Sequence, residues 1–293
     1  MANQTPQHKS NALLSKNASA TTTPAYRAEL KTEPALVKAG EPVTLKFTIR
    51  DAKGGIVCNL QVVHEWLIHL LVISDDLSEF YHLHPMQQSD GTFQSTHIFP
   101  QAGNYRLYVD YTPPSTTQLV DQLGLKVSGK ERTAVVLVED ESATKTVDGL
   151  RVTLKPSKSL RAGEEVMLDF AITDERTNEP VTDLQPYLGA LAHFVIISSD
   201  GAEFLHAHPV EKTEIPAAHG ASHKAMPHTH GEEMTINLSH SPQTSASQVS
   251  AHTSFPRTGL YKVWAQFQRG GQIITVPFVV RVADGEVLTN LKT

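Results

Sequence analysis

The residues best suited to chemistry in this chain are its histidines. The 293 residues include 15 histidines, and all but His8 fall between His64 and His252. Two groups share one spacing, in which a histidine inside a hydrophobic run is followed by an H-x-H step. Neutral imidazole is a preferred ligand of zinc and copper, so three imidazoles on one face could hold an ion. The two groups are His69, His82 and His84, and His193, His206 and His208.

A β-hairpin would bring each group together. The segments SDDLSEF and SSDGAEF between the histidines are typical of turns. If the strands are antiparallel, opposed residues in the first group have numbers that sum to 151 or 153, so His69 faces either His82 or His84. In the second group the sums are 399 or 401. Every one of these registers puts all three side chains on one face, with opposed Cβ atoms about 4.5–5.5 Å apart.

The two groups belong to an internal repeat. Residues 60–85 align without a gap on residues 184–209, with nearly half of the positions identical, and the flanking segments also agree. Neighbouring positions have diverged, as in the pairs Trp66/Ala190 and Tyr81/Leu205, while the histidines are the same in both copies. This favours metal binding by the triplets. For a single histidine such as His97, a surface or hydrogen-bonding role is the expectation.

The repeat also predicts the fold. Hydrophobic residues alternate through segments such as VTLKFTI (43–49), which is typical of half-buried strands, and no segment has a sustained helical period. We therefore expect an all-β chain of two tandem immunoglobulin-like β-sandwich domains, with a barrel as the alternative. The expected ranges are a disordered N-terminal tail (1–25), domain 1 (26–141) and domain 2 (142–293).

One insertion distinguishes the second copy. Residues 210–250 are rich in Ser, Thr, Pro, Ala and His, lack a hydrophobic period, and are expected to form a mobile loop. Its histidines are additional metal-ligand candidates, while a tolerated surface insertion is the alternative. The loop candidates are His219, His223, His228 and His230, with Met226 and Met234 beside them.

Three further positions are open to more than one interpretation. His64 could be a fourth ligand of the first triplet, or could face solvent or cap a turn, because Leu188 takes its place in the second copy. Met86 is a candidate thioether ligand for Cu(I). Carboxylates at Glu79 and Glu203 could hold an imidazole tautomer, but edge-strand solubility is the preferred interpretation.

Charge, hydrophobic runs and the motifs of the sequence argue against several classes of function. A formal charge of −6 without a run of Lys or Arg argues against nucleic acid as a partner. The longest hydrophobic run is too short to span a bilayer, and residues 1–28 lack the hydrophobic core of a secretory signal. HEWLIH at residue 64 is not an HExxH motif, and no Ser-His-Asp arrangement or phosphate loop is found, so we predict that the protein is not an enzyme.

At the histidines the sequence also resembles bacterial extracytoplasmic proteins of the YtkA-like and heavy-metal-associated kind. The resemblance covers both repeats, from His64 to Pro85 and from Tyr187 to Pro209, but not the tail or the loop. It implies an immunoglobulin-like sandwich, an extracytoplasmic location and a role in copper or heavy-metal handling. The absence of a recognisable signal peptide departs from that pattern.

The sequence thus predicts a transition-metal binding protein involved in metal buffering or delivery, with copper preferred over zinc. The expected partners are the ion and a metal-receiving or metal-exporting protein. The alternative is a structural or adhesive immunoglobulin-like interaction module without a functional metal. All-imidazole ligation suits both Cu(II) and Zn(II), and Cu(II) heads the divalent affinity order.

The loop generates a first prediction. Sites in a flexible segment lose chain entropy when they close around an ion, so they should bind more weakly than the strand triplets while raising the local supply of metal. Deleting residues 215–247 should therefore slow metal uptake from a weak chelator and barely change equilibrium affinity. An unaltered rate would contradict the gathering role, and a collapse in affinity would show that the loop supplies primary ligands.

Overall fold

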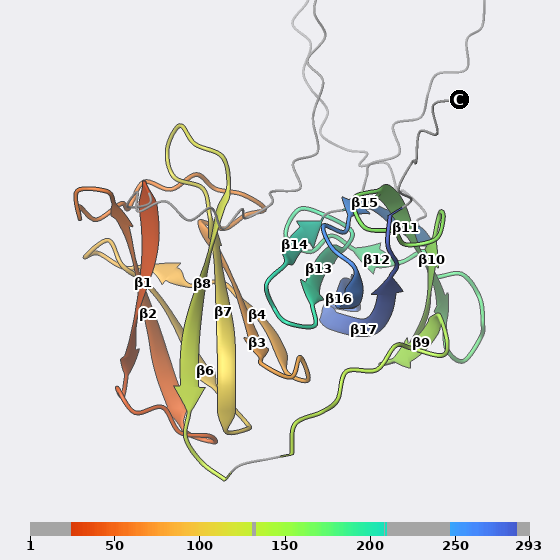
Figure 1. The fold of residues 1–293 in the computed structure, drawn as a ribbon, viewed down its shortest axis with the longest axis horizontal. Helices are drawn as coiled ribbons and strands as arrows, with labels where there is room; N and C mark the ends of the chain where they lie inside the picture. Colours follow the sequence, from red (N-terminus) through yellow and green to blue (C-terminus); the bar gives the residue numbers. More distant parts are fainter. Residues whose placement is uncertain (1–24, 131–132, 208, 210–246, 286–293) are drawn as a thin grey trace, which may run out of the picture.

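Every element in the described part of the chain is a β-strand. The computed structural model describes residues 25–130, 133–207, 209 and 247–285 (Figure 1). The strands of the first domain are β1 (Tyr26–Glu33), β2 (Pro42–Asp51), β3 (Ile68–Ser74), β4 (Phe80–Leu83), β5 (Met86–Gln87), β6 (Phe93–Ile98), β7 (Gly103–Tyr111) and β8 (Leu119–Val127). Those of the second are β9 (Thr144–Val147), β10 (Leu150–Pro156), β11 (Glu165–Asp174), β12 (Leu184–Gln185), β13 (His193–Ser198), β14 (Phe204–Ala207), β15 (Gln248–Ser254), β16 (Gly259–Arg269) and β17 (Gln272–Val282).

The strands form two β-sandwiches, as predicted. In the first domain the sheet β1-β2-β6-β5 packs against the sheet β4-β3-β7-β8, and all pairs are antiparallel. In the second domain the sheet β15-β11-β10-β9 packs against a sheet built from β12, β16, β13 and β14, with β17 paired to β16. The all-β prediction of two tandem immunoglobulin-like sandwiches is therefore confirmed. No helix that could cross a membrane occurs among the described residues.

Alternation along the strands builds a separate core in each domain. On β2 the buried residues Val43, Leu45, Phe47 and Ile49 face inward, and β11 repeats the pattern with Val166, Leu168, Phe170 and Ile172. Each set joins a cluster of buried side chains confined to its own sandwich. The opposite faces of these strands are partly exposed, as expected for the outer face of a sandwich.

Two strands depart from that alternation because both of their faces are covered. Every residue of β3 and β13 is buried. On β3, Leu70 and Val72 point into the core of the first domain, while Leu71 and Ile73 join a third hydrophobic cluster with Val195 and other residues of the second domain. The continuous hydrophobic run is the sequence pattern of a strand buried on two sides. The domains thus pack against each other through their β3 and β13 sheets (Figure 1).

The interface has approximate two-fold symmetry. Trp264 stacks on Phe80 with ring centroids 4.8 Å apart, and the repeat-equivalent pair, Tyr108 and Phe204, stacks at 4.9 Å. Lys262 donates a hydrogen bond to the carbonyl oxygen of Leu77, and its equivalent Arg106 donates to that of Asp200. Because each stacking pair and each side-chain bond to a carbonyl has a counterpart in reversed order, the bond of Arg106 being shifted by one residue, the two domains meet approximately as the halves of an isologous dimer do.

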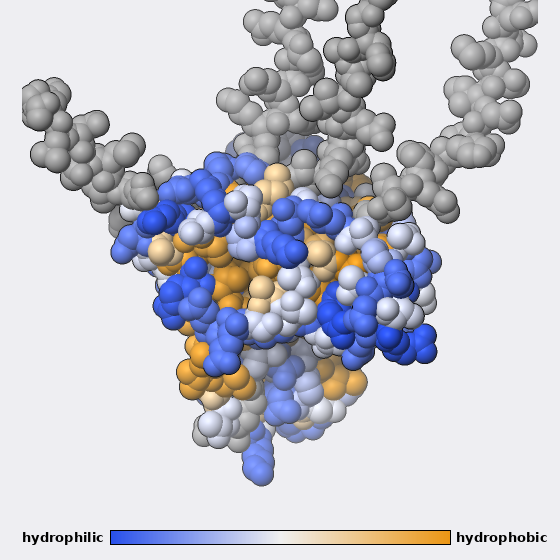
Figure 2. Space-filling model, turned by 90° about the vertical axis from the view of Figure 1, so that its right-hand side faces the viewer, coloured by the Kyte–Doolittle hydropathy of each residue, from blue (hydrophilic) through white to orange (hydrophobic). Residues whose placement is uncertain are grey.

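Exposed hydrophobic side chains are scattered on the described surface. The face of the second domain that lies opposite the interface mixes hydrophilic residues with smaller hydrophobic areas (Figure 2). Large exposed hydrophobics include Leu36 in the first domain and Ile273 in the second. The third cluster, by contrast, is a buried hydrophobic contact that each domain makes with the other.

The third cluster generates a prediction about stability. Leu71 is fully buried between the domains, so Leu71→Ala should lower the free energy of unfolding by about 2–4 kcal/mol through the cavity it leaves. Leu36 is 62% exposed, and the matched Leu36→Ala variant should change stability by no more than about 0.5 kcal/mol. Urea unfolding followed by tryptophan fluorescence measures both. Equal effects of the two variants would contradict the two-sided burial of β3.

Candidate metal centre

The β3–β4 hairpin adopts one of the two expected registers. Leu70 pairs with Leu83 and Leu71 with His82, so paired residues sum to 153 and His69 is level with His84. The β13–β14 hairpin matches it, since Phe194 pairs with Ala207 and paired residues sum to 401. The three imidazoles of the first triplet consequently leave the same face of the sheet. That face is the one turned toward the second domain.

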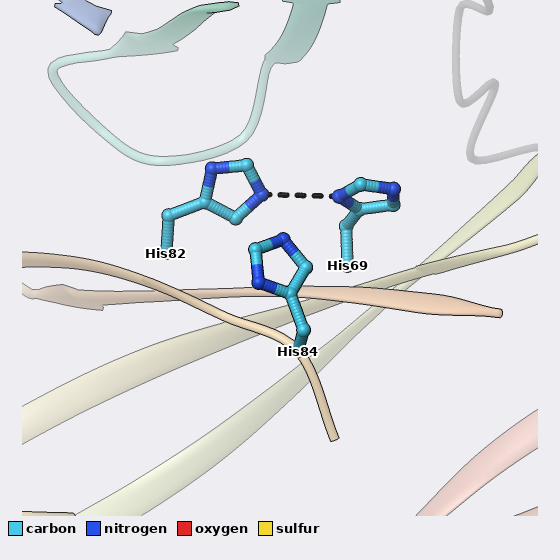
Figure 3. Close-up of side chains that lie close together, drawn as sticks. All are labelled: His69, His82 and His84. Atoms are coloured by element: carbon cyan, nitrogen blue, oxygen red, sulfur yellow. Dashed lines mark hydrogen bonds between the residues drawn. The ribbon is translucent and has the colours of Figure 1, made fainter. Parts of the chain in front are cut away.

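The first triplet has the geometry of a ligand set. One ligand nitrogen from each of His69, His82 and His84 lies within 4.8 Å of the others. The His69 Nδ1 and His82 Nε2 atoms are 3.1 Å apart, and the ring of His84 points toward the gap between them (Figure 3). Two imidazole nitrogens bound at about 2.0 Å to one tetrahedral ion lie about 3.3 Å apart. The three rings could therefore bind one ion after small rotations.

The second triplet lies beside the first. The ring centroid of His206 is 5.7 Å from that of His69 and 5.8 Å from that of His82, and His193 is 6.2 Å from His82. The sequence prediction placed a separate cluster in each domain, but the described histidines meet in one cluster at the interface. The hydrophobic face that carries each triplet is buried by the other domain, which brings the triplets together. His208 lies outside the described residues.

Tight turns fix the orientation of His69 and His193. The bridges Val63–Trp66 and Tyr187–Ala190 close two-residue turns whose central residues all have positive φ, as in type I′ turns. Each turn presents a carbonyl oxygen that accepts a hydrogen bond from an imidazole Nε2–H, at 2.9 Å from Val63 to His69 and 2.8 Å from Tyr187 to His193. The Nδ1 atom of both rings therefore carries the lone pair.

His82 and His206 are held by residues of the opposite domain. His82 Nδ1–H donates to Gln266 Oε1 at 2.8 Å, and His206 Nδ1–H donates to Asp110 Oδ2 at 3.0 Å. Gln118 donates to both oxygens of Asp110 at 2.7 and 2.6 Å. Asp110 and Gln266 occupy equivalent positions in the repeat, beside His69 and His193 on the neighbouring strands. Both imidazoles are left with the lone pair on Nε2.

The sequence does not predict these two partners, and edge-strand solubility is its preferred interpretation of Glu79 and Glu203. Glu79 accepts a hydrogen bond from Tyr81, and Glu203 accepts one from Arg257 at 2.6 Å, so the bonds described for them do not reach the triplets. A signal for Asp110 was present, because YRLYVDY and YKVWAQF each hold one polar residue near the end of a hydrophobic strand. Its identity as a partner depended on the domain packing.

The remaining candidates have different positions. The His64 ring lies 5.6 Å from His193 and 6.4 Å from His69, so it borders the cluster from its turn. Met86 is 57% exposed on β5 rather than buried with the histidines. Trp66 stacks on His84 with centroids 4.9 Å apart and covers that ring. The loop candidates His219, His223, His228 and His230 lie outside the described residues.

Burial keeps the imidazoles neutral. Desolvation, with smaller contributions from neighbouring histidines, lowers the pKa of His84 to about 3 and that of His193 to about 4. Burial also lowers the pKa values of His82 and His206 well below the ordinary value. Desolvation raises the pKa of Asp110 to about 6, although its bonds from Gln118 act in the opposite direction. At neutral pH the cluster thus offers neutral imidazoles, the form that binds metals.

The fold and the site together define a class: a tandem immunoglobulin-like sandwich protein with a buried histidine cluster between its domains. The chain belongs to the family described as "Domain of unknown function (DUF8832)", whose model matches residues 20–129 and 145–284. No curated protein matches the chain. The resemblance to YtkA-like proteins stays a prediction.

Solved structures provide distant similarities. The adhesin FdeC of Escherichia coli is 17% identical, with 87% of this chain and 64% of that chain covered and a TM-score of 0.26. InvD of Yersinia pseudotuberculosis is 13% identical over 91% of this chain and 60% of that chain, with a TM-score of 0.25. A Salmonella alpha-2-macroglobulin is 14% identical over 94% of this chain and 16% of its own, with a TM-score of 0.27. Likeness at these scores says nothing of function.

The lowered pKa values predict how stability depends on pH in the metal-free protein. Because His84 and His193 titrate at about 3 and about 4 when folded, and near 6.5 when unfolded, the unfolded chain binds protons first as the pH falls. The free energy of unfolding should therefore be highest above about pH 6.5 and decrease below it. Asp110, with its raised pKa of about 6, acts in the opposite direction between about pH 4 and 6.

Urea unfolding between pH 7.5 and 4.5 measures this dependence. His193→Gln removes one titrating group, so the slope below about pH 6.5 should become shallower by up to about 1.4 kcal/mol per pH unit. A flat profile in the parent protein, or an unchanged slope in the variant, would contradict the neutral buried imidazoles.

Proposed function

We propose that this protein binds a transition-metal ion through His69, His82 and His84, and that it handles, buffers or delivers that metal. Copper is the first choice and zinc the second. The role is binding rather than catalysis. An extracytoplasmic location and a metal-receiving or metal-exporting partner belong to the proposal and are supported by the sequence resemblance alone.

The facing lone pairs of two histidines are the observation that supports this proposal best. The bond to Val63 leaves the lone pair of His69 on Nδ1, and the bond to Gln266 leaves that of His82 on Nε2. These two nitrogens face each other at 3.1 Å. A cation between them would satisfy both lone pairs, whereas a hydrogen bond across the same gap requires one of the two nitrogens to carry a proton. With the bonds to Val63 and Gln266 in place, a proton between the two nitrogens would create an imidazolium ion. Burial disfavours this ion and lowers the pKa of both rings.

The ligand chemistry supports copper over zinc by a small margin. All-imidazole sites suit Cu(II) and Zn(II), and copper binds more tightly to a given set of nitrogen ligands. Methionine sulfur suits Cu(I), and Met86 follows His84 by two residues at the surface. Met226 and Met234 lie in the loop, outside the described residues.

A second function, without a metal, is supported by a different observation. The bonds from His82 to Gln266 and from His206 to Asp110 cross the domain interface, so the same imidazoles also join the domains. In this alternative the chain is a structural or adhesive module, and the histidines serve as hydrogen-bonding groups. Metal titration separates the two functions.

Purified protein titrated calorimetrically with Cu²⁺ and with Zn²⁺ should bind one of them tightly, with affinity that falls as the pH drops through about 6.5. The double variant His69→Ala/His82→Ala should lose that binding, because it removes two of the three proposed ligands. His252→Ala is the matched control, since His252 is a partly exposed histidine beside Glu165 on another sheet. A parent protein that binds neither ion would favour the structural alternative.

A further inference from the structure

The two halves of the histidine cluster are not equivalent in charge. Repeat symmetry pairs His82 with Gln266 and His206 with Asp110, so one imidazole meets a neutral amide and the other meets a carboxylate. The Asp110 and His206 side chains are each only 3% exposed. A buried carboxylate is costly unless its negative charge is compensated. An imidazole that donates a hydrogen bond to the carboxylate compensates that charge best when a cation binds its other ring nitrogen.

Ring positions place His206 close to the first triplet. Within the triplet the ring centroids lie 4.7 to 5.4 Å apart. Rings bound to one tetrahedral ion with metal–nitrogen bonds of about 2.0 Å have centroids about 5 Å apart. His206 lies 5.7 Å from His69 and 5.8 Å from His82, which is less than an ångström beyond that spacing for these two rings. Its Nε2 is buried and carries the lone pair.

We propose that His206 of the second domain is the fourth ligand of the ion held by His69, His82 and His84, and that Asp110 of the first domain is its positioning residue. This inference rests on the proposed metal-binding function. It makes the centre a four-imidazole site shared by the two domains, in place of one three-histidine site in each. Four neutral imidazoles leave the charge of a divalent ion intact, and Asp110 offsets part of it through the His206 ring.

A shared centre couples the metal to the docking of the domains. Three ligands come from β3, β4 and the residue after β4, and the fourth comes from β14. An ion that binds all four is bound tightly only when the domains are docked, so it stabilises the docked state by an amount that rises with the logarithm of its concentration over its dissociation constant. In the absence of metal, the hydrophobic cluster and the hydrogen bonds across the interface dock the domains.

The test uses the full chain, with Zn²⁺ for affinity and Co²⁺ as a spectroscopic probe. Four-coordinate Co²⁺ absorbs visible light far more strongly than Co²⁺ with added water ligands, so band intensity reports the ligand set. His206→Ala should weaken Zn²⁺ binding by about 100-fold or more and reduce the Co²⁺ band. Asp110→Asn should weaken binding by about 10–100-fold and shift the band, because it removes the charge and one acceptor oxygen.

His97→Ala is the matched control, because His97 is a partly buried histidine of the first domain that packs on Tyr81 and Phe99 outside the cluster. It should leave both readouts unchanged. A merely structural role of His206 or Asp110 would lower metal-free stability without altering the Co²⁺ band. Should His206→Ala not fold, His206→Gln replaces it and is read in the same way.

The outcomes separate the two proposals. Loss of the band in the His206 and Asp110 variants, with the parent spectrum in His97→Ala, supports the shared centre. A parent protein that binds metal, together with variants that keep its affinity and spectrum, overturns the shared centre and leaves the proposed function standing. A parent protein that binds none of Cu²⁺, Zn²⁺ and Co²⁺ overturns both.

Discussion

The contact between the outer faces of β3 and β13 is the constraint on which the rest of the structure depends. Each strand is hydrophobic on both sides, so a sandwich by itself would leave one hydrophobic face in water. Docking the domains buries Leu71 and Ile73 against Val195 and Ile197. The same docking removes the histidines at one end of that face from solvent. The hydrophobic face whose burial stabilises the docked domains is therefore the same face that carries the histidine triplets.

Burying so many imidazoles is unfavourable unless their nitrogens find partners. The structure provides one fixed partner for each of four rings: a turn carbonyl for His69 and His193, and a side chain of the other domain for His82 and His206. These bonds select the tautomers, and those of His69 and His82 place two lone pairs face to face. The arrangement is costly for a purely structural interface, where hydrophobic residues of similar size would pack without orienting polar atoms.

Periodicity was sufficient to predict the sandwiches, and spacing was sufficient to predict a triplet on one face, because both follow from residues near one another in the chain. The choice between the two registers was not predictable, since it depends on how the SDDLSEF turn closes. The meeting of the triplets does not follow from either hairpin alone. The continuous hydrophobic runs of β3 and β13 already indicated two-sided burial. Asp110 and Gln266 become partners only after the domains dock, a contact that no local pattern contains.

The duplication accounts for the symmetry of the interface, and the differences between the copies show where the symmetry is broken. An isologous contact between identical halves would place identical groups on both sides of its axis. Here the stacking pairs and the carbonyl contacts keep that pairing, whereas an amide at Gln266 stands opposite a carboxylate at Asp110. One negative charge beside a set of neutral imidazoles favours a single cation near His206 over two equivalent ones, because a second cation would lack its own compensating charge. The broken symmetry therefore favours the single shared centre proposed above.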